Sequence, residues 1–173
     1  MACLVAESIN LVCTHDRILR MNLDRFDRAI LQILQADGRI SNTELAQRVN
    51  LSESACLRRV RALEQSGLIE RYAAILNQQK AGLPVNVFVN ITLDRQDEPD
   101  LRKFEESVRN IPEVMECYLM TGDYDYTVRV VVSDTADFER VHSKYLTRLP
   151  GVARVHSSFA LRTVQKAREL PLR

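Results

Sequence analysis

Apolar positions follow a helical spacing in the first half of the chain and an alternating spacing in much of the second half. The first clear pattern begins at Leu23, where Asn22 or Asp24 can cap a helix that Gly38 ends. The apolar stripe of this helix consists of Leu23, Phe26, Ile30 and Leu34. With the two segments that follow it, this pattern predicts three helices between about residues 24 and 66.

The stretch from Ser41 to Gly67 predicts two capped helices that are separated by a tight turn. Ser41 with Glu44 has the spacing of a capping box, and the short helix that they start is expected to end near Asn50. Ser52 is a second N-cap, and Gly67 is a C′ residue that closes the longer helix. The buried face of that helix is formed by Cys56, Val60 and Leu63. Its free face therefore carries Ser54, Leu57, Arg58 and Arg61.

A short helix, a tight turn and a longer helix with a basic free face form the arrangement of a helix-turn-helix that reads duplex DNA. An ordinary helical hairpin with solvated arginines is the alternative. The next segment, LIERYAAIL from Leu68 to Leu76, is rich in strand formers and predicts a wing strand that carries Arg71 and Tyr72. The polar stretch at 77–84, with its glycine and proline, marks a linker.

The second half has a regular alternation of strand and helix patterns. These are a strand from Val85 to Asp94, a helix from Pro99 to Asn110, strands from Val114 to Thr121 and Tyr124 to Val132 joined at Gly122-Asp123, a helix from Thr135 to Leu149, and a strand from Gly151 to Val164. The order β-α-β-β-α-β predicts a ferredoxin-like antiparallel sheet with two helices on one face. The other face, which includes Phe88, is left bare and is expected to pair with a second copy.

The fold class is therefore α+β, with an N-terminal winged helix-turn-helix and a C-terminal ferredoxin-like βαββαβ domain. The expected domains are an N-terminal arm at 1–21, a DNA-binding domain at 22–76, the linker at 77–84, and an effector-binding and oligomerisation domain at 85–168. The 173 residues are enough for two small domains with real cores, and 46% hydrophobic with 27% charged residues argues against wholesale disorder.

The net charge of +1 gives no global cationic field, which counts against nucleic acid as a partner. The charges are nevertheless segregated along the chain. Three arginines fall within the four residues from Arg58 to Arg61, while four acids against one base fall between Asp94 and Asp100. This segregation is typical of a basic module joined to a more acidic one.

The arm at 1–21 is expected to be disordered, and Met21, just before the helical pattern, is a hypothetical natural start. The first 20 residues lack a basic n-region, and no apolar run is long enough to span a bilayer, so we expect a cytoplasmic protein. The four cysteines are then expected to be free thiols. Cys3, Cys13 and His15 form too loose a group to predict a metal site.

Three runs of sequence carry a family resemblance. The run LDRFDRAILQILQADGRISNTELAQRVNLSESACLRRVRALEQSGLIERYAAILN, with IPEVMECYLMTGDYDYTVRV and LPGVARVHSSFALRTV further on, resembles the Lrp/AsnC (leucine-responsive/asparagine-responsive, feast/famine) regulators over residues 22–168. The resemblance implies a nucleoid-associated transcription factor that is not an enzyme and binds double-stranded DNA. It also implies a homodimer, assembly to tetramers or octamers, and a response to an amino acid or related metabolite, with no other cofactor.

The DNA-contacting residues are expected on the second helix of the helix-turn-helix. Hydroxyls and free amides at its N-terminus receive phosphates, and arginines on its free face reach phosphates or base edges. Arg59 lies nearer the buried flank, so packing and DNA contact both remain open for it. Leu57 is exposed and placed to meet a thymine methyl. The candidate set is Ser52, Ser54, Leu57, Arg58, Arg59 and Arg61.

The hairpin TGDYDY is the second candidate site. An amino acid needs acceptors for its ammonium group and backbone amides for its carboxylate, and a glycine allows close approach. The resemblance implies an effector site that is formed by Met120, Thr121, Gly122, Asp123, Tyr124 and Asp125, with Ser158 and Phe159 as weaker candidates. A hairpin tip whose aspartates only satisfy the turn is the alternative, and it stays open for Asp123, whereas Asp125 is expected to bind ligand. Met120 and Phe159 favour an apolar effector such as leucine or methionine.

Two other classes of function were considered. Some proteins with this fold decarboxylate sirohaem with histidine and arginine near the wing, but the wing segment here has Arg71 and no histidine. The histidines His15, His142 and His156 are expected to be structural or surface residues. A DNA-organising oligomer that responds to no ligand is the second alternative.

Overall fold

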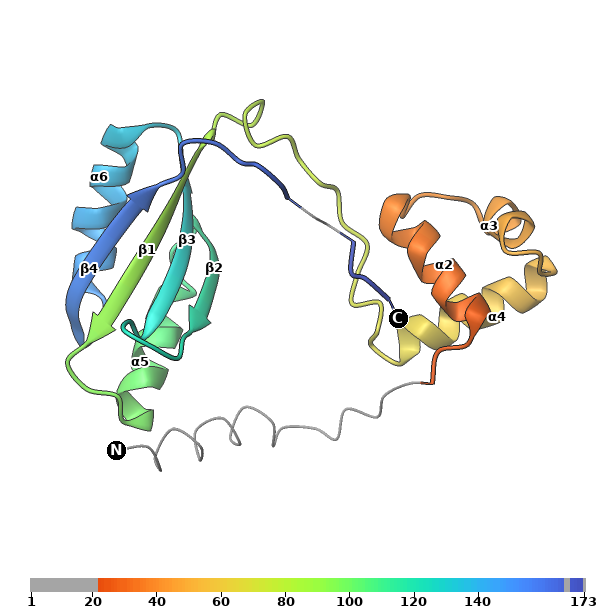
Figure 1. Cartoon of the computed structure of the whole chain (residues 1–173), viewed down its shortest axis with the longest axis horizontal. Coiled ribbons are helices and arrows are strands. Elements are labelled where there is room, and N and C mark those ends of the chain that lie inside the picture. The colour runs from red at the N-terminus through yellow and green to blue at the C-terminus, as the bar shows by residue number, and fades with distance from the viewer. Residues whose placement is uncertain (1–21, 167–168, 173) are drawn as a thin grey trace. The chain divides into compact units, whose positions relative to one another are not determined.

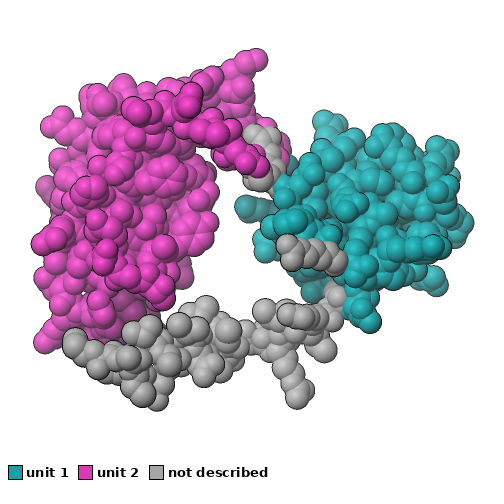
Figure 2. Space-filling view, viewed as in Figure 1, with its two compact units in different colours: residues 1–73, 167–173 teal, residues 74–166 magenta. Residues whose placement is uncertain are grey.

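The computed structural model of the chain describes residues 22–166 and 169–172. The expectations for the arm at 1–21, including a start at Met21 and a loose group of Cys3, Cys13 and His15, lie outside the described residues. The chain divides into two compact units, residues 1–73 with 167–173 and residues 74–166 (Figure 2). No helix in the described ranges is long and apolar enough to cross a membrane.

Three helices form the first unit, as the apolar spacing predicts. They are α2 (Arg25–Ala36), α3 (Asn42–Arg48) and α4 (Glu53–Gln65). Their apolar stripes meet in one core, because each helix is polar on its other side. The buried members of this core are Ile30, Leu31, Leu45, Ala46, Val49, Cys56 and Leu63.

The helix caps are largely those that the sequence predicts, with one difference. Ser41 caps α3 by accepting the backbone N–H of Glu44 at 3.1 Å. In a complete capping box the carboxylate of Glu44 would accept the backbone N–H of Ser41. It pairs instead with Arg48, one turn further along the helix, at 2.6 Å. A complete capping box is present instead on α2, where Asp24 and Asp27 each accept the other's backbone N–H.

The predicted wing strand is wrong, because residues 68–76 form no strand. A strand needs a hydrogen-bonded neighbour, and the described part of this unit contains no second strand that could pair with it. Tyr72 holds the segment against the helices instead. Its hydroxyl donates to Glu64 at 3.0 Å, and its ring lies so close to Gly38 that a Cβ there would be 3.3 Å away. Burial raises the pKa of Tyr72 to about 12, and the Glu64 carboxylate adds to this shift.

The second unit has the predicted ferredoxin-like fold. Its elements are β1 (Val85–Leu93), α5 (Glu98–Val108), β2 (Val114–Leu119), β3 (Tyr126–Val132), α6 (Thr135–Lys144) with the short 3-10 helix η1 (Leu146–Arg148), and β4 (Val152–Phe159). The antiparallel strands lie in the order β2-β3-β1-β4, with α5 and α6 on one face (Figure 1). The aliphatic face of β1 forms the core with Phe104 of α5 and Val141 of α6.

The last strand is shorter than predicted. Its pairing with β1 ends where Phe159 lies opposite Val87, and one further bond joins the N–H of Ala160 to the carbonyl of Asn86. Leu161, two residues further on, is fully exposed rather than part of an alternating strand.

The open face of the sheet carries hydrogen-bonded polar side chains rather than a continuous apolar surface. Phe88 is exposed there, as predicted. Beside it Arg129 donates to Asn86 at 3.1 Å and to Glu116 at 2.6 Å. The hydrogen bond from Arg129 holds the pKa of Glu116 below its usual value. Strand alternation therefore places hydrogen-bonded polar pairs beside Phe88 on this face.

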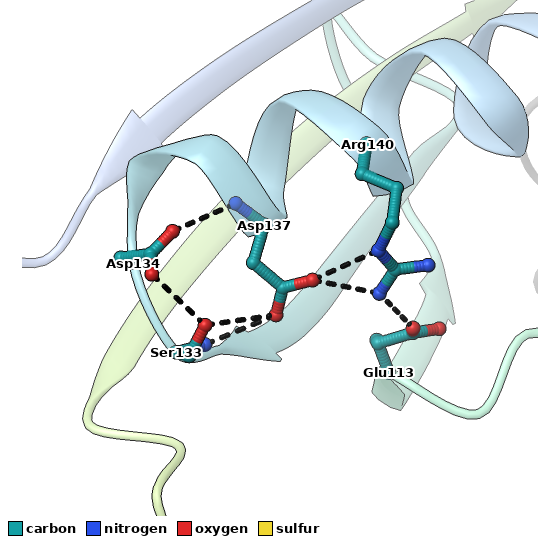
Figure 3. A network of polar contacts seen from close by, with 5 residues as sticks. All are labelled: Glu113, Ser133, Asp134, Asp137 and Arg140. Carbon is teal, nitrogen blue, oxygen red and sulfur yellow. Dashed lines mark hydrogen bonds and ion pairs between the residues drawn. The ribbon is translucent and has the colours of Figure 1, made fainter.

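A polar network fixes the start of α6 to the segment before β2 (Figure 3). Asp134 caps the helix by accepting the N–H of Asp137 at 2.8 Å, and Asp137 accepts the N–H of Ser133 at 3.1 Å. Arg140 then joins Asp137 at 2.7 Å to Glu113 at 2.6 Å. The backbone hydrogen bond from Ser133, followed by the one from Arg140, lowers the pKa of Asp137.

The lowered pKa of Asp137 predicts a pH-dependent contribution to stability. A carboxyl with a lower pKa in the folded state stabilises the fold above its unfolded pKa and loses this contribution as pH falls through the folded value. Asp137→Asn should therefore reduce resistance to urea at neutral pH and have less effect in strongly acidic buffer. Glu139→Gln, an exposed acid on the same helix, is the control. Equal destabilisation by Asp137→Asn at both pH values would contradict the charge-based account.

Candidate nucleic-acid interface and effector site

Arg58 and Arg61 lie on the free face of α4. The opposite face of the helix is buried through Cys56 and Leu63, which fixes the rotation of the helix about its axis. Both arginines are exposed, and neither forms an ion pair with any residue that the structure describes. Their guanidinium groups are therefore free to meet phosphates or guanine edges.

The turn before α4 is made at Asn50, near which the sequence predicts the end of the short helix. Asn50 has a φ of 54°, in the left-handed region, where asparagine is tolerated better than most residues. The turn is closed by the N–H of Leu51, which donates to the carbonyl of Ala46 at 2.9 Å. The side chain of Asn42 also crosses to the carbonyl of Glu53 at 3.0 Å. The asparagine at the end of the short helix was the sequence signal for this sharp turn.

Arg59 is held inside the first unit. Its Nη1 lies 2.8 Å from the carboxylate of Asp24 and 2.7 Å from that of Asp27, and its guanidinium lies 5.4 Å from the ring centre of Phe26. The two carboxylates form the capping box of α2, so Arg59 ties α4 to the start of α2. Of the two roles open for Arg59, packing is the one that these contacts supply.

The remaining candidates on α4 occupy different positions. The hydroxyl of Ser52 serves as the N-cap by accepting the N–H of Ala55 at 3.3 Å, and it lies 3.3 Å from the hydroxyl of Ser54. Ser54 is exposed beside the helix N-terminus. Leu57 is 37% exposed on the same side as the free arginines. The structure thus brings Ser54, Leu57, Arg58 and Arg61 onto one accessible surface.

The hairpin loop between β2 and β3 presents most of the predicted effector residues. The N–H of Met120 donates to the carbonyl of Asp125 at 2.8 Å and closes the loop. Gly122 has a φ of 138°, a backbone conformation that residues with a side chain rarely adopt. Thr121 and Asp123 are exposed at its tip, so the Asp123 carboxylate is accessible.

Asp125 is engaged within the protein. Its carboxylate is buried and accepts hydrogen bonds from the N–H of Leu93 and from the amide of Gln96, both at 2.7 Å. The expected ligand acceptor therefore anchors the hairpin to the segment that follows β1. Gln96, which sequence reasoning missed, supplies a partner 29 residues away in the chain.

Ser158 and Phe159 lie at the other end of the sheet from the hairpin loop. Phe159 is opposite Val87 on β1, whereas the loop adjoins Tyr126, which is opposite Ile91. Val87 and Ile91 are four residues apart on β1, which corresponds to about 13 Å along the strand. Phe159 packs edge-on against Phe138, at a centroid distance of 5.2 Å. One subunit therefore does not bring the two weaker candidates together with the loop.

A surface hollow of about 480 Å³ between α5 and β2 was not predicted from the sequence. Leu119 and Tyr126, the residues that flank the hairpin loop, are among its lining. Within it, the hydroxyl of Tyr126 donates to Glu105 at 2.9 Å. Burial raises the pKa of Cys117 to about 11, so this lining thiol stays protonated and unreactive at neutral pH. The hollow extends the candidate site from the loop toward α5.

The different positions of the two loop aspartates predict different effects on stability. Asp125→Ala should lower the free energy of unfolding by about 1–3 kcal/mol, because the buried N–H of Leu93 loses its acceptor. Asp123→Ala should leave it nearly unchanged, because the side chain is exposed. Urea denaturation of both variants measures the difference, and equal effects would contradict this assignment.

Comparison with known proteins places both units in described families. A model of the winged helix-turn-helix DNA-binding domain matches residues 23–70, and a model of the Lrp/AsnC ligand binding domain matches residues 86–170. The chain is 44% identical over 150 residues to the Bkd operon transcriptional regulator of Pseudomonas aeruginosa, covering 87% of this chain and 98% of the relative.

Two further relatives agree with this assignment. The chain is 40% identical over 152 residues to the leucine-responsive regulatory protein of Klebsiella pneumoniae, covering 88% and 93% of the two chains. The crystal structure of a transcriptional regulator from Neisseria meningitidis in complex with L-Met superposes with a TM-score of 0.82 at 37% identity, covering 86% of this chain and 96% of that one. The chain therefore belongs to the Lrp/AsnC family of transcriptional regulators.

Proposed function

We propose that the protein binds double-stranded DNA through α4 and that an amino acid bound to its second unit alters DNA binding or assembly. The observation that carries the proposal is that the guanidinium groups of Arg58 and Arg61 are exposed and form no ion pair with any described residue, beside a capped helix N-terminus. Family membership supports regulation rather than catalysis, so no residue is assigned a catalytic role, and the amino acid is the only small ligand proposed.

DNA contact follows from the size and charge of α4. A helix fits the major groove, where arginine recognises guanine through two hydrogen bonds and reaches phosphates from the groove edge. Ser54 and the first amides of the helix receive a phosphate, because the helix N-terminus carries partial positive charge. Arg59 acts as a positioning residue, since its contacts with Asp24 and Asp27 orient α4.

Assembly as a homodimer follows from the need to present two copies of α4. Half-sites on one side of the duplex are about 34 Å apart, and a two-fold dimer matches this repeat. The open sheet face, with Phe88 exposed among polar pairs, is the surface that we assign to the second copy. Further pairing of dimers gives the tetramer or octamer, and the bound state places the protein on the nucleoid.

The effector site is assigned to the hairpin loop and the adjoining hollow. Asp123 accepts the ammonium group of the ligand, and Gly122 allows its carboxylate to approach backbone amides. The hollow has a volume in the range of small-molecule sites, and the exposed side chains of Leu119 and Met120 offer apolar contact. A relative that is named leucine-responsive and a structural neighbour solved with L-Met support an apolar amino acid.

DNA binding is tested with arginine variants on duplexes that the wild-type protein selects from a random pool. Arg58→Ala or Arg61→Ala should weaken binding by about 1–3 kcal/mol for a base contact, and loss of a phosphate contact should reduce the salt slope by about 1. Fluorescence anisotropy at several salt concentrations measures both effects. Arg102→Ala, at an exposed arginine of α5 that pairs with Glu98, is the control for loss of one arginine outside the DNA-binding unit. An unchanged footprint for the Arg58/Arg61 double variant would exclude α4 as the reading helix.

Effector binding is tested by calorimetric titration against all twenty amino acids. We expect leucine or methionine to bind and Asp123→Asn to weaken that binding about tenfold or more, because a charge-assisted hydrogen bond is lost. Glu139→Gln is the control for loss of a carboxylate elsewhere. Sedimentation with and without the binding amino acid then distinguishes regulated assembly from a ligand-independent oligomer. Absence of heat with every amino acid would refute the effector assignment and leave the DNA test intact.

A further inference from the structure

The C-terminal segment of the chain returns to the DNA-binding unit. Residues 169–172 group with the helices of the first unit, although β4 and residues up to 166 belong to the second (Figure 2). The two units are therefore joined by two chain segments, one that follows Ala73 and one that follows Lys166.

Two hydrogen bonds attach this segment to α2. The N–H of Leu170 donates to the side-chain oxygen of Gln35 at 2.6 Å, and the side-chain amide of Gln35 donates to the carbonyl of Leu170 at 3.4 Å. Gln35 thus pairs with both the backbone N–H and the backbone carbonyl of Leu170, as a residue on a neighbouring strand would. The contact fixes the path of the backbone and does not depend on the side chain of Leu170, which is 72% exposed.

Leu172 supplies the apolar part of the attachment. Its side chain is partly buried and packs against the same core that α2, α3 and α4 share. The segment therefore covers an edge of the helical core and removes apolar surface from water.

The other end of the segment is attached to the sheet. Ala160 continues the β4 ladder through its N–H to Asn86, and residues 162–166 line a hollow of about 600 Å³ on the open face beside Phe88. The attachments at Ala160 and Leu170 are thus ten positions apart, a span of at most about 35 Å. A body held by one flexible linker reorients freely, whereas a second attachment of limited length restricts that freedom.

We propose that the C-terminal segment acts as an intramolecular clamp, in which docking of Leu170 and Leu172 on α2 restrains the DNA-binding unit relative to the sheet. The clamp rests on the proposed function, because its benefit arises when a dimer engages two half-sites. Once one α4 is bound, restraint raises the effective concentration of the second α4 at its half-site. Binding to a single half-site gains nothing from it.

Docking is tested on the full chain by the exchange protection of the Leu170 amide in nuclear magnetic resonance spectra. The amide should be protected in the wild type and lose that protection in Gln35→Ala and Leu172→Ser. Gln47→Ala, a surface glutamine on α3, and Leu170→Ser, which keeps the backbone contact, are the matched controls. A Leu170 amide that exchanges freely in the wild type would overturn the proposal. Gln35→Ala changes a surface side chain and serves as the decisive variant if Leu172→Ser fails to fold.

The consequence of docking is tested by comparing duplexes with one and two half-sites. Gln35→Ala and Leu172→Ser should lower the ratio of two-site to one-site affinity by roughly threefold or more and leave one-site affinity unchanged. An unchanged ratio in variants that have lost amide protection would overturn the clamp. A wild-type protein that binds neither duplex would refute the proposed function instead, while the amide measurement still decides whether the segment docks.

Discussion

Burial of one face of α4 is the constraint on which the interpretation of this protein depends. Cys56 and Leu63 are almost fully buried, so the helix cannot rotate without exposing its core side. With that rotation fixed, the spacing of 3.6 residues per turn sends Arg58 and Arg61 outward. Arg59 falls on the flank, where the two carboxylates of the α2 capping box neutralise its charge. One packing interaction thus separates arginines that are available to DNA from one that positions the helix.

In the second unit, contacts with the sheet fix the position of the hairpin loop between β2 and β3. Strand β1 is paired on both sides, with β3 and β4, and is one of the two inner strands of the sheet. The hairpin loop is mounted on that strand, because the N–H of Asp125 donates to the carbonyl of Ile91 and its carboxylate accepts the N–H of Leu93. A loop held in this way presents Gly122 and Asp123 in a defined position, as a binding site requires. Asp125, the aspartate that the sequence predicts as a ligand acceptor, is therefore the one that fixes the loop to the sheet.

Sequence patterns predicted the elements whose formation depends on local interactions. Ser41, Ser52 and Gly67 mark helix ends because capping involves residues within one turn, and β1 was evident because its aliphatic positions alternate without interruption. Predictions failed where a distant partner decides the outcome. Residues 68–73 have strand-forming side chains but no strand to pair with among the described residues of the first unit, and β4 ends at Phe159 although the alternating pattern runs on to Val164.

The sequence by itself determined the α+β class, the helix-turn-helix with its basic helix face, and the hairpin that carries the glycine and the aspartates, since these follow from periodicity and turn chemistry. Only the tertiary structure decided the separate roles of neighbouring side chains. Arg59 differs from Arg58 because Asp24 and Asp27 lie beside it, and Asp125 differs from Asp123 because Leu93 and Gln96 reach it. The attachment of Leu170 to Gln35 spans 135 positions, and no local pattern encodes it. In each case the role depends on which groups distant parts of the chain bring within hydrogen-bonding distance.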